Sequence, residues 1–168
     1  EGEGAAAALP FQSYGLNLLH KHVPEIQRQA ALQTRPIFLP SYGNFRQGIS
    51  LTIGLHASML HQPVPAEVLR ELLTQRYRGH RHVQVLNADQ TDAFVRLDSQ
   101  ALNDSNDLQL AVFGNDTLGQ LLLSAVFDNL GKGAAGAAVQ NLALMLGLAD
   151  VSGIQHQGTA LDLLEQAA

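Results

Sequence analysis

The stretch that decides the fold is Val126-Phe127-Asp128-Asn129-Leu130-Gly131-Lys132-Gly133-Ala134-Ala135-Gly136-Ala137-Ala138-Val139-Gln140-Asn141. An apolar run over 121–127 leads into a polar turn, a glycine-rich loop and a helix of small residues. Free backbone N–H groups at such a helix start, with Lys132 beside them, form a ready site for an anion or a polar ligand head. The segment therefore predicts a strand, a ligand-competent loop and a helix in succession.

The same stretch matches the dinucleotide fingerprint through Gly131, Gly133 and Gly136, but the surrounding sequence excludes a Rossmann domain. That fingerprint requires a βαβ unit of about thirty residues and an acidic residue about twenty positions further on. After Gly136 one helix and a short tail follow, and no β-rich apolar run comes after Asp150, the nearest acid. A Walker A loop is excluded because no Ser or Thr follows Lys132. Two interpretations remain: a ligand loop, or small residues that let the helix pack closely against a sheet.

The rest of the chain contains further strands and helices. Apolar and polar residues alternate over 49–56, and turn-forming residues at 114–117 separate the apolar runs 108–113 and 118–127, which predicts a hairpin. Proline suits a helix start, so helices are predicted at 24–32 and after Pro65. The remaining predicted elements are strands at 36–40, 83–85 and 94–97, and helices at 133–148 and 159–165. Hairpins with segregated helices predict an α+β fold, with a mostly antiparallel sheet and helices packed on one face.

Proton-active side chains precede the helix that Pro24 opens. His20 and His22 stand two residues apart, and Glu25 follows three residues later. A histidine held by a carboxylate suits general acid–base catalysis near neutral pH. Zinc binding is a rival interpretation, although His-x-His-x-x-Glu is no specific zinc pattern, and a surface turn with incidental histidines is the third. These residues alone leave all three open.

Composition bounds the class of protein. The chain has 168 residues, of which 46% are hydrophobic and 15% charged, the balance of one packed globular domain. A net charge of −5 without a dense Lys/Arg cluster argues against a nucleic-acid partner. No apolar run is long enough to span a membrane and no signal peptide is visible, so we expect a cytoplasmic protein. Because the chain has no cysteine, it performs no thiol chemistry by itself.

Three segments together carry a resemblance to a known family. They are Tyr-Gly at 14–15 with His-Lys-His-Val-Pro-Glu at 20–25, Phe-Leu-Pro-Ser-Tyr-Gly-Asn-Phe-Arg-Gln-Gly-Ile at 38–49, and Asp-Asn-Leu-Gly-Lys-Gly-Ala-Ala-Gly-Ala-Ala-Val-Gln-Asn at 128–141. In this order and spacing they are similar to the C-terminal domain of N-acetyl-γ-glutamyl-phosphate reductase, the NADPH-dependent enzyme of arginine biosynthesis. The resemblance rests on the combination of the three motifs.

The resemblance implies a fold, a reaction and partners. The fold is the C-terminal domain of glyceraldehyde-3-phosphate-dehydrogenase-like enzymes: a dimerisation and substrate domain over 1–148, and a tail over 149–168 that returns to an N-terminal NADP-binding domain. In the reaction a cysteine thiolate attacks an acyl phosphate, phosphate leaves, and hydride from NADPH reduces the thioester to the semialdehyde. The implied partners are the Rossmann domain of the same protein, the acyl-phosphate substrate, and further copies in a homodimer or homotetramer.

The resemblance also assigns roles to residues. His20 would be the general acid–base that activates the thiol and protonates the forming aldehyde oxygen. The implied substrate-binding residues are Tyr14, His22, Glu25 and Arg46. The residues implied to face the nicotinamide end of NADPH are Asn129, Gly131 and Gly133. No metal is expected.

The chain departs from this family in several features. The family's Pro-Gly-Cys nucleophile segment, its Rossmann domain and its Ser-Gly-x-Ser-Gly loop are all N-terminal, and this sequence contains none of them. Since the chain begins at Glu1 rather than Met, we expect a processed or cut piece of a longer protein that is inactive alone. Gln47 precedes Gly48 where the commoner form has arginine, and Arg46 stands one earlier, which suggests the shorter type 2 subgroup. Two alternatives stay open: a reductase of another acyl phosphate, aminoadipyl or aspartyl, and a non-catalytic binding or scaffold domain of the same fold.

Overall fold

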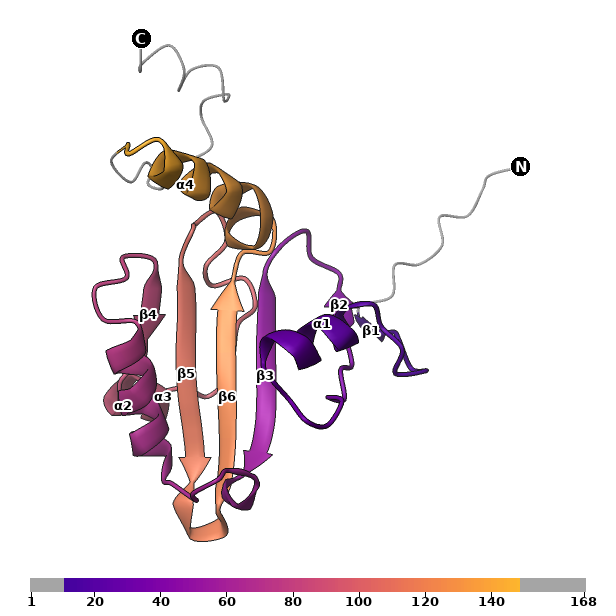
Figure 1. The fold of residues 1–168 in the computed structure, drawn as a ribbon, viewed down its shortest axis with the longest axis vertical. Coiled ribbons are helices and arrows are strands. Elements are labelled where there is room, and N and C mark those ends of the chain that lie inside the picture. Colours follow the sequence, from indigo (N-terminus) through magenta and orange to yellow (C-terminus); the bar gives the residue numbers. More distant parts are fainter. Residues whose placement is uncertain (1–10, 149–168) are drawn as a thin grey trace. The chain divides into compact units, whose positions relative to one another are not determined.

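The structure of the protein is a computed structural model, which describes residues 11–148 (Figure 1). The chain divides into two compact units between Arg46 and Gln47, and each unit is described by itself. The predicted tail at 149–168 and the predicted helix at 159–165 lie outside the described residues. No helix of the described part has the length and apolar character needed to cross a bilayer.

The first unit holds two short strands and one helix. The strands β1 (Phe11–Ser13) and β2 (Ser41–Gly43) pair antiparallel, and α1 (His22–Gln29) lies between them in the sequence. The helix begins two residues before Pro24, so the proline stands in the first turn, where its missing N–H costs no helical hydrogen bond. The strand predicted at 36–40 is wrong. Prolines bound this run and cannot donate to a ladder, Ile37 is 84% exposed, and strand pairing begins only at Ser41.

The second unit is built around a four-stranded sheet in the order β3-β6-β5-β4. Three of its strands are antiparallel neighbours: β3 (Ile49–His56), β6 (Gln120–Phe127) and β5 (Leu108–Asn115). Only the short β4 (Val83–Val85) runs parallel to its neighbour β5. A 3-10 turn at Asp116–Leu118 joins β5 to β6, so the predicted hairpin is confirmed. The α+β class with a mostly antiparallel sheet is confirmed as well.

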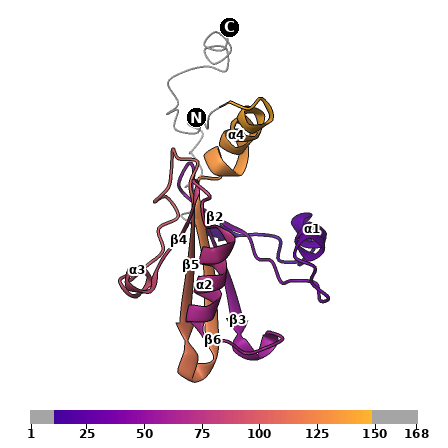
Figure 2. The ribbon, with the colours of Figure 1, turned by 60° about the vertical axis from the view of Figure 1, so that its left-hand side comes forward.

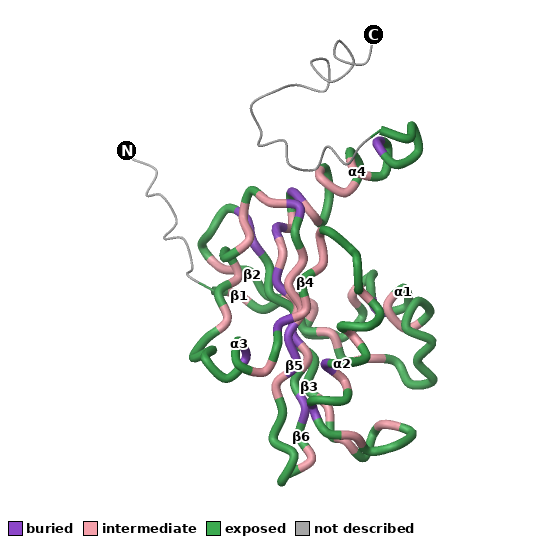
Figure 3. The backbone as a smooth tube through the Cα atoms, turned by 90° about the vertical axis from the view of Figure 1, so that its left-hand side faces the viewer, coloured by how far each residue is buried: buried purple, intermediate pink, exposed green. Residues whose placement is uncertain are grey.

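The core lies where the longest helix packs on this sheet. Val112 of β5 and Leu121 of β6 point to the same face, and α2 (Ala66–Arg76) covers that face through Ala66, Leu69 and Leu73. Figure 2 shows α2 lying along the strands, and the buried stretches in Figure 3 follow the strands of the sheet. Apolar burial between α2 and the β5–β6 hairpin therefore stabilises the second unit.

Shorter elements complete the second unit. Ala57–Met59 forms a 3-10 turn after β3, and α3 (Ala88–Asp92) follows β4. The strand predicted at 94–97 is wrong, because Phe94 makes an edge contact with the ring of Phe113, centroids 6.1 Å apart, while Val95 is 98% exposed. The helix predicted at 133–148 is confirmed with shifted ends: a π-helical turn at Gly131–Ala135 continues into α4 (Gly136–Met145).

Candidate functional site

An aromatic and imidazole cluster forms around His20 in the first unit. The centroid of the His20 ring lies 4.8 Å from that of His22, 5.1 Å from that of Phe38 and 5.8 Å from that of Tyr14. Tyr42 extends the cluster, with its ring 5.6 Å from that of Tyr14. The structure thus brings together three residues that the sequence predicts for the site, namely Tyr14, His20 and His22.

His20 is held at the start of α1 by its backbone and by its ring. Its carbonyl oxygen accepts the N–H of Val23 at 2.9 Å, and its Nδ1 accepts the N–H of His22 at 3.2 Å. A backbone N–H can only donate, so Nδ1 is the unprotonated nitrogen of the neutral ring and Nε2 carries the proton. His20 therefore offers an N–H donor, which suits stabilisation of negative charge on an oxygen atom.

The other two substrate-site candidates do not join this cluster. Glu25 is exposed in the first turn of α1, and no hydrogen bond or ion pair links it to His20 or His22. An acidic residue in a first turn is favourable by itself, because it complements the helix dipole. Arg46 is exposed at the end of the first unit. Across residues 11–148, no three His, Asp or Glu side chains gather as a metal site would require.

Asp128 organises the glycine-rich loop, although the sequence did not single it out. This carboxylate is only 2% exposed. Its Oδ1 accepts the N–H groups of Leu130 at 2.8 Å and Gly131 at 3.0 Å, and its Oδ2 accepts the N–H of Asp104 at 2.8 Å and Nε2 of Gln47 at 3.1 Å. Two N–H groups at the helix start are therefore already satisfied by the chain's own carboxylate and are not available to an external anion.

Asn129 is bound next to this carboxylate. Its Oδ1 accepts the N–H of Gly48 at 2.8 Å, which leaves the side-chain NH₂ group as a donor. Gly48 has a φ of 107°, and a Cβ at this position would collide with the carbonyl oxygen of Ser99, so only glycine fits. The sequence signal was the Gln47-Gly48 pair, but its partner lies 81 residues away.

Close packing also explains the small residues of the loop. A Cβ at Gly131 would lie 2.9 Å from the carbonyl oxygen of Ser105. Gln140 of α4 accepts hydrogen bonds from Nδ2 of Asn106 at 2.9 Å and from Nζ of Lys132 at 3.4 Å. Lys132 is thus directed to its own helix. The close approach at Gly131 explains the small residue at that loop position, whereas most of α4 is exposed and does not pack against the sheet as the small residues predicted.

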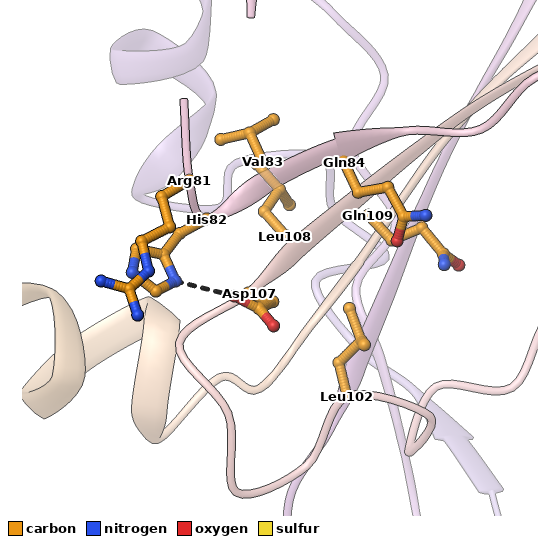
Figure 4. A pocket seen from close by; sticks show the side chains of 8 residues that line it. All are labelled: Arg81, His82, Val83, Gln84, Leu102, Asp107, Leu108 and Gln109. Carbon is orange, nitrogen blue, oxygen red and sulfur yellow. Dashed lines mark hydrogen bonds and ion pairs between the residues drawn. The ribbon is translucent and has the colours of Figure 1, made fainter. Parts of the chain in front are cut away.

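A separate pocket of about 380 Å³ opens beside β4 and β5 in the second unit (Figure 4). On its wall, Nδ1 of His82 lies 2.8 Å from Oδ1 of Asp107. Gln84, Gln109 and Leu102 line it further. None of the predicted site residues lines this pocket, so the motifs and this pocket mark different places on the chain.

Comparison with known proteins adds to this geometry. The model of the "semialdehyde dehydrogenase, dimerisation domain" family matches residues 3–129. N-acetyl-gamma-glutamyl-phosphate reductase 2 of Pseudomonas putida is 57% identical over 153 residues, covering 91% of this chain and 49% of that protein. The N-acetyl-gamma-glutamyl-phosphate reductase of Burkholderia ambifaria is 57% identical over 149 residues, covering 89% and 47%. N-acetyl-gamma-glutamyl-phosphate reductase 2 of Nostoc sp. is 41% identical over 155 residues, covering 90% and 48%. The chain spans about half the length of these curated relatives.

Proposed function

The chain belongs to the family of semialdehyde dehydrogenase dimerisation domains, and we propose that it is the C-terminal domain of an NADPH-dependent N-acetyl-γ-glutamyl-phosphate reductase. The observation that carries the proposal is 57% identity to reductases of that name over about 90% of the chain. Two of the three motifs that predict the same enzyme, at 14–25 and 38–49, lie within the residues that the family model matches. The whole protein would act in arginine biosynthesis in the cytoplasm.

His20 is the proposed catalytic residue of this chain. A thiolate from outside the chain would attack the acyl carbon and expel phosphate, which leaves a thioester. NADPH, when bound, would supply the hydride, and the thiolate would leave again as the aldehyde forms. As negative charge develops on the carbonyl oxygen, Nε2–H of His20 donates a hydrogen bond to that oxygen. The bond from the His22 N–H to Nδ1 keeps the ring in the tautomer that this task needs.

The proposed substrate site consists of the residues around His20. Tyr14 and His22 stack against its ring by their edges and so restrict how it turns. Both also carry polar groups that suit the acyl chain and the phosphate. Glu25 and Arg46 complete the proposed set, with Arg46 as the cationic member.

Asn129, with Gly131 and Gly133, is proposed to face the nicotinamide end of NADPH. The local hydrogen bonding fits the nicotinamide carboxamide, because the side-chain oxygen of Asn129 is already bound to Gly48. The remaining NH₂ donor matches a carboxamide oxygen, which accepts hydrogen bonds. The family description supports self-association, and we propose a homodimer or homotetramer together with an N-terminal Rossmann domain as partners.

A fusion protein tests the proposed function. The N-terminal half of the Pseudomonas putida reductase is joined to this chain, and NADPH oxidation is followed with N-acetylglutamyl phosphate and with aspartyl and aminoadipyl phosphates. We expect turnover with the first substrate only, and none by the 168-residue chain alone. Turnover by the isolated chain would contradict the proposal. If the fusion protein prefers another acyl phosphate, that compound is the substrate instead of N-acetylglutamyl phosphate.

One observation favours a second candidate, a non-catalytic binding or scaffold domain of the same fold. The chain has no cysteine, so the nucleophile of the proposed reaction must come from elsewhere. A fusion protein that folds and self-associates but reduces none of the three acyl phosphates supports this candidate.

A further inference from the structure

We infer that Asp128 is a positioning residue of the proposed site and that Gln47 acts through it: together they fix the loop that carries Asn129. The inference rests on the proposed function, because it concerns the loop proposed to meet NADPH. It adds two residues, for which the resemblance to the family implies no role.

Asp128 joins three segments that are distant in the sequence. Through Oδ2 it binds Gln47, just before β3, and Asp104, in the loop before β5. Through Oδ1 it binds the backbone at the start of the glycine-rich helix. A carboxylate that is 2% exposed and accepts four hydrogen bonds is held rigidly. The position of the residue next to it is therefore set by three parts of the second unit at once.

Gln47 is the group that this arrangement requires between two carboxylates. Its Nε2 donates to Oδ1 of Asp104 at 2.8 Å and to Oδ2 of Asp128 at 3.1 Å, and the residue is 8% exposed. Carboxylates only accept hydrogen bonds, so the atom between them must donate to both. A primary amide has two N–H groups on one nitrogen and meets this demand without adding charge.

Two parallel links then connect the same two dipeptides. Gln47 binds Asp128 side chain to side chain, and the next residue, Gly48, donates its N–H to Oδ1 of Asn129. Losing the first link frees the loop to move relative to the start of β3, which weakens the second. The amide of Asn129 then no longer presents its NH₂ group in one fixed direction, and a ligand must order it on binding.

The substitution Asp128→Asn tests this role with little change of shape. The new Oδ1 can still accept the N–H groups of Leu130 and Gly131. The new NH₂ group, however, faces the donors of Gln47 and Asp104, so two donor–acceptor contacts become donor–donor contacts. In the fusion protein we expect the dissociation constant for NADPH, measured by calorimetry, to rise ~10-fold. The reason is that a small misplacement of a binding group weakens the contacts that it makes with the ligand. The KM for the acyl phosphate should stay within about twofold.

Gln47→Leu should raise the same dissociation constant, and combined with Asp128→Asn it should add almost nothing, because both act through one link. Asp116→Asn is the matched control. Asp116 accepts the N–H of Ala66 at the start of α2, at 3.0 Å, so this variant perturbs a helix start outside the proposed site and should leave NADPH binding unchanged. If Asp128→Asn lowers the melting temperature but binds NADPH as the wild type does, Asp128 is merely structural. A wild-type fusion that neither binds NADPH nor turns over overturns the proposed function itself.

Discussion

The two units of the chain hold their proposed site residues in different ways. Among residues 11–46, Val23 is the one buried residue, and His20 is positioned by ring edges and by the start of a short helix. In the second unit, Asn129 follows a buried carboxylate with four hydrogen bonds and lies beside a sheet with a packed core. The first unit carries the proposed catalytic residue and has one buried residue in the described range, whereas the second has a packed sheet and a hydrogen-bonded carboxylate.

This difference teaches where substitutions should separate activity from stability. A residue held mainly by exposed contacts contributes little to the free energy of unfolding, so its loss is felt in catalysis. A residue in the packed sheet affects both, because the scaffold fails with it. Each prediction below compares a change in one unit with a matched change that isolates its cause.

The largest expected effect is loss of turnover on changing His20. In the fusion protein, His20→Ala should lower kcat by ~10²–10⁴, the usual contribution of a proton-transfer or oxyanion-stabilising group, with little change in melting temperature. His20→Asn sharpens the comparison. The side-chain oxygen of the new asparagine can still accept the His22 N–H, as a helix cap does, but asparagine has no imidazole ring. Both variants should be equally slow. His82→Ala, which removes a half-exposed pair with Asp107 outside the proposed site, is the control and should be fully active; an active His20→Asn variant would reduce His20 to a helix cap.

The next effect compares leucines of the two units. Leu86 is 2% exposed and its N–H donates to the carbonyl of Leu110 at 2.8 Å, whereas Leu16 is 72% exposed. Leu86→Ala should lower the free energy of unfolding by about 2–5 kcal/mol through the lost burial and the cavity left behind. Leu16→Ala should change it by less than about 0.5 kcal/mol. Urea denaturation of the 168-residue chain measures both, and equal losses would contradict the contrast drawn between the units.

Local patterns predicted the long strands and the hairpin of the second unit well, although the strand predicted at 94–97 is wrong. The alternation over 49–56 and the turn residues at 114–117 report periodicity and turn chemistry, which are properties of neighbours in sequence. The strand predicted at 36–40 failed because the prolines that bound this apolar run, taken as strand ends, leave the ladder without donors. The motif at 20–25 predicted that His20 and His22 lie together. It did not predict the tautomer of His20, which depends on the path of the backbone at His22.

Asp128 shows what a single sequence hides. A signal was available, since an aspartate shortly before a glycine-rich helix start can accept backbone N–H groups two and three residues ahead, as an N-cap side chain does. Nothing in the local pattern indicates that the other oxygen of this carboxylate binds Gln47, 81 residues away. Such pairings depend on how β3 and β6 align in the sheet, and local pattern carries no information on that. Free helix-start N–H groups were therefore expected where the fold has already satisfied two of them.

A smaller effect on the free energy of unfolding is expected at Arg70, the one buried cationic side chain among the described residues of the second unit. Arg70 pairs with Glu67, and its guanidinium donates to the carbonyl oxygen of Val112 at 3.0 Å and to Oγ1 of Thr91 at 3.4 Å. Arg70→Ala should cost about 1–3 kcal/mol, because the buried Val112 carbonyl and the Thr91 hydroxyl lose a charged donor. Arg76→Ala, in the last turn of the same helix and exposed over the ring of Tyr77, should cost less than about 1 kcal/mol. Thermal unfolding followed by circular dichroism compares them, and a larger loss for Arg76→Ala would contradict the structural role of Arg70.

The smallest expected effect tests helix capping in the two units. In the second, Asn87 and Gln90 form a reciprocal box at the start of α3, each side chain bound to the other's N–H at 2.9 Å. In the first, Lys21 caps α1 with no side-chain hydrogen bond, and the His22 N–H turns to His20 instead. Asn87→Ala should cost about 0.5–2 kcal/mol and speed amide exchange in α3, while Lys21→Ala should change neither by a measurable amount. If Lys21→Ala destabilises the chain as much as Asn87→Ala, then α1 depends on its lysine rather than on His20. In that case His20 would be free of a structural task, and its kinetic effect would report chemistry alone.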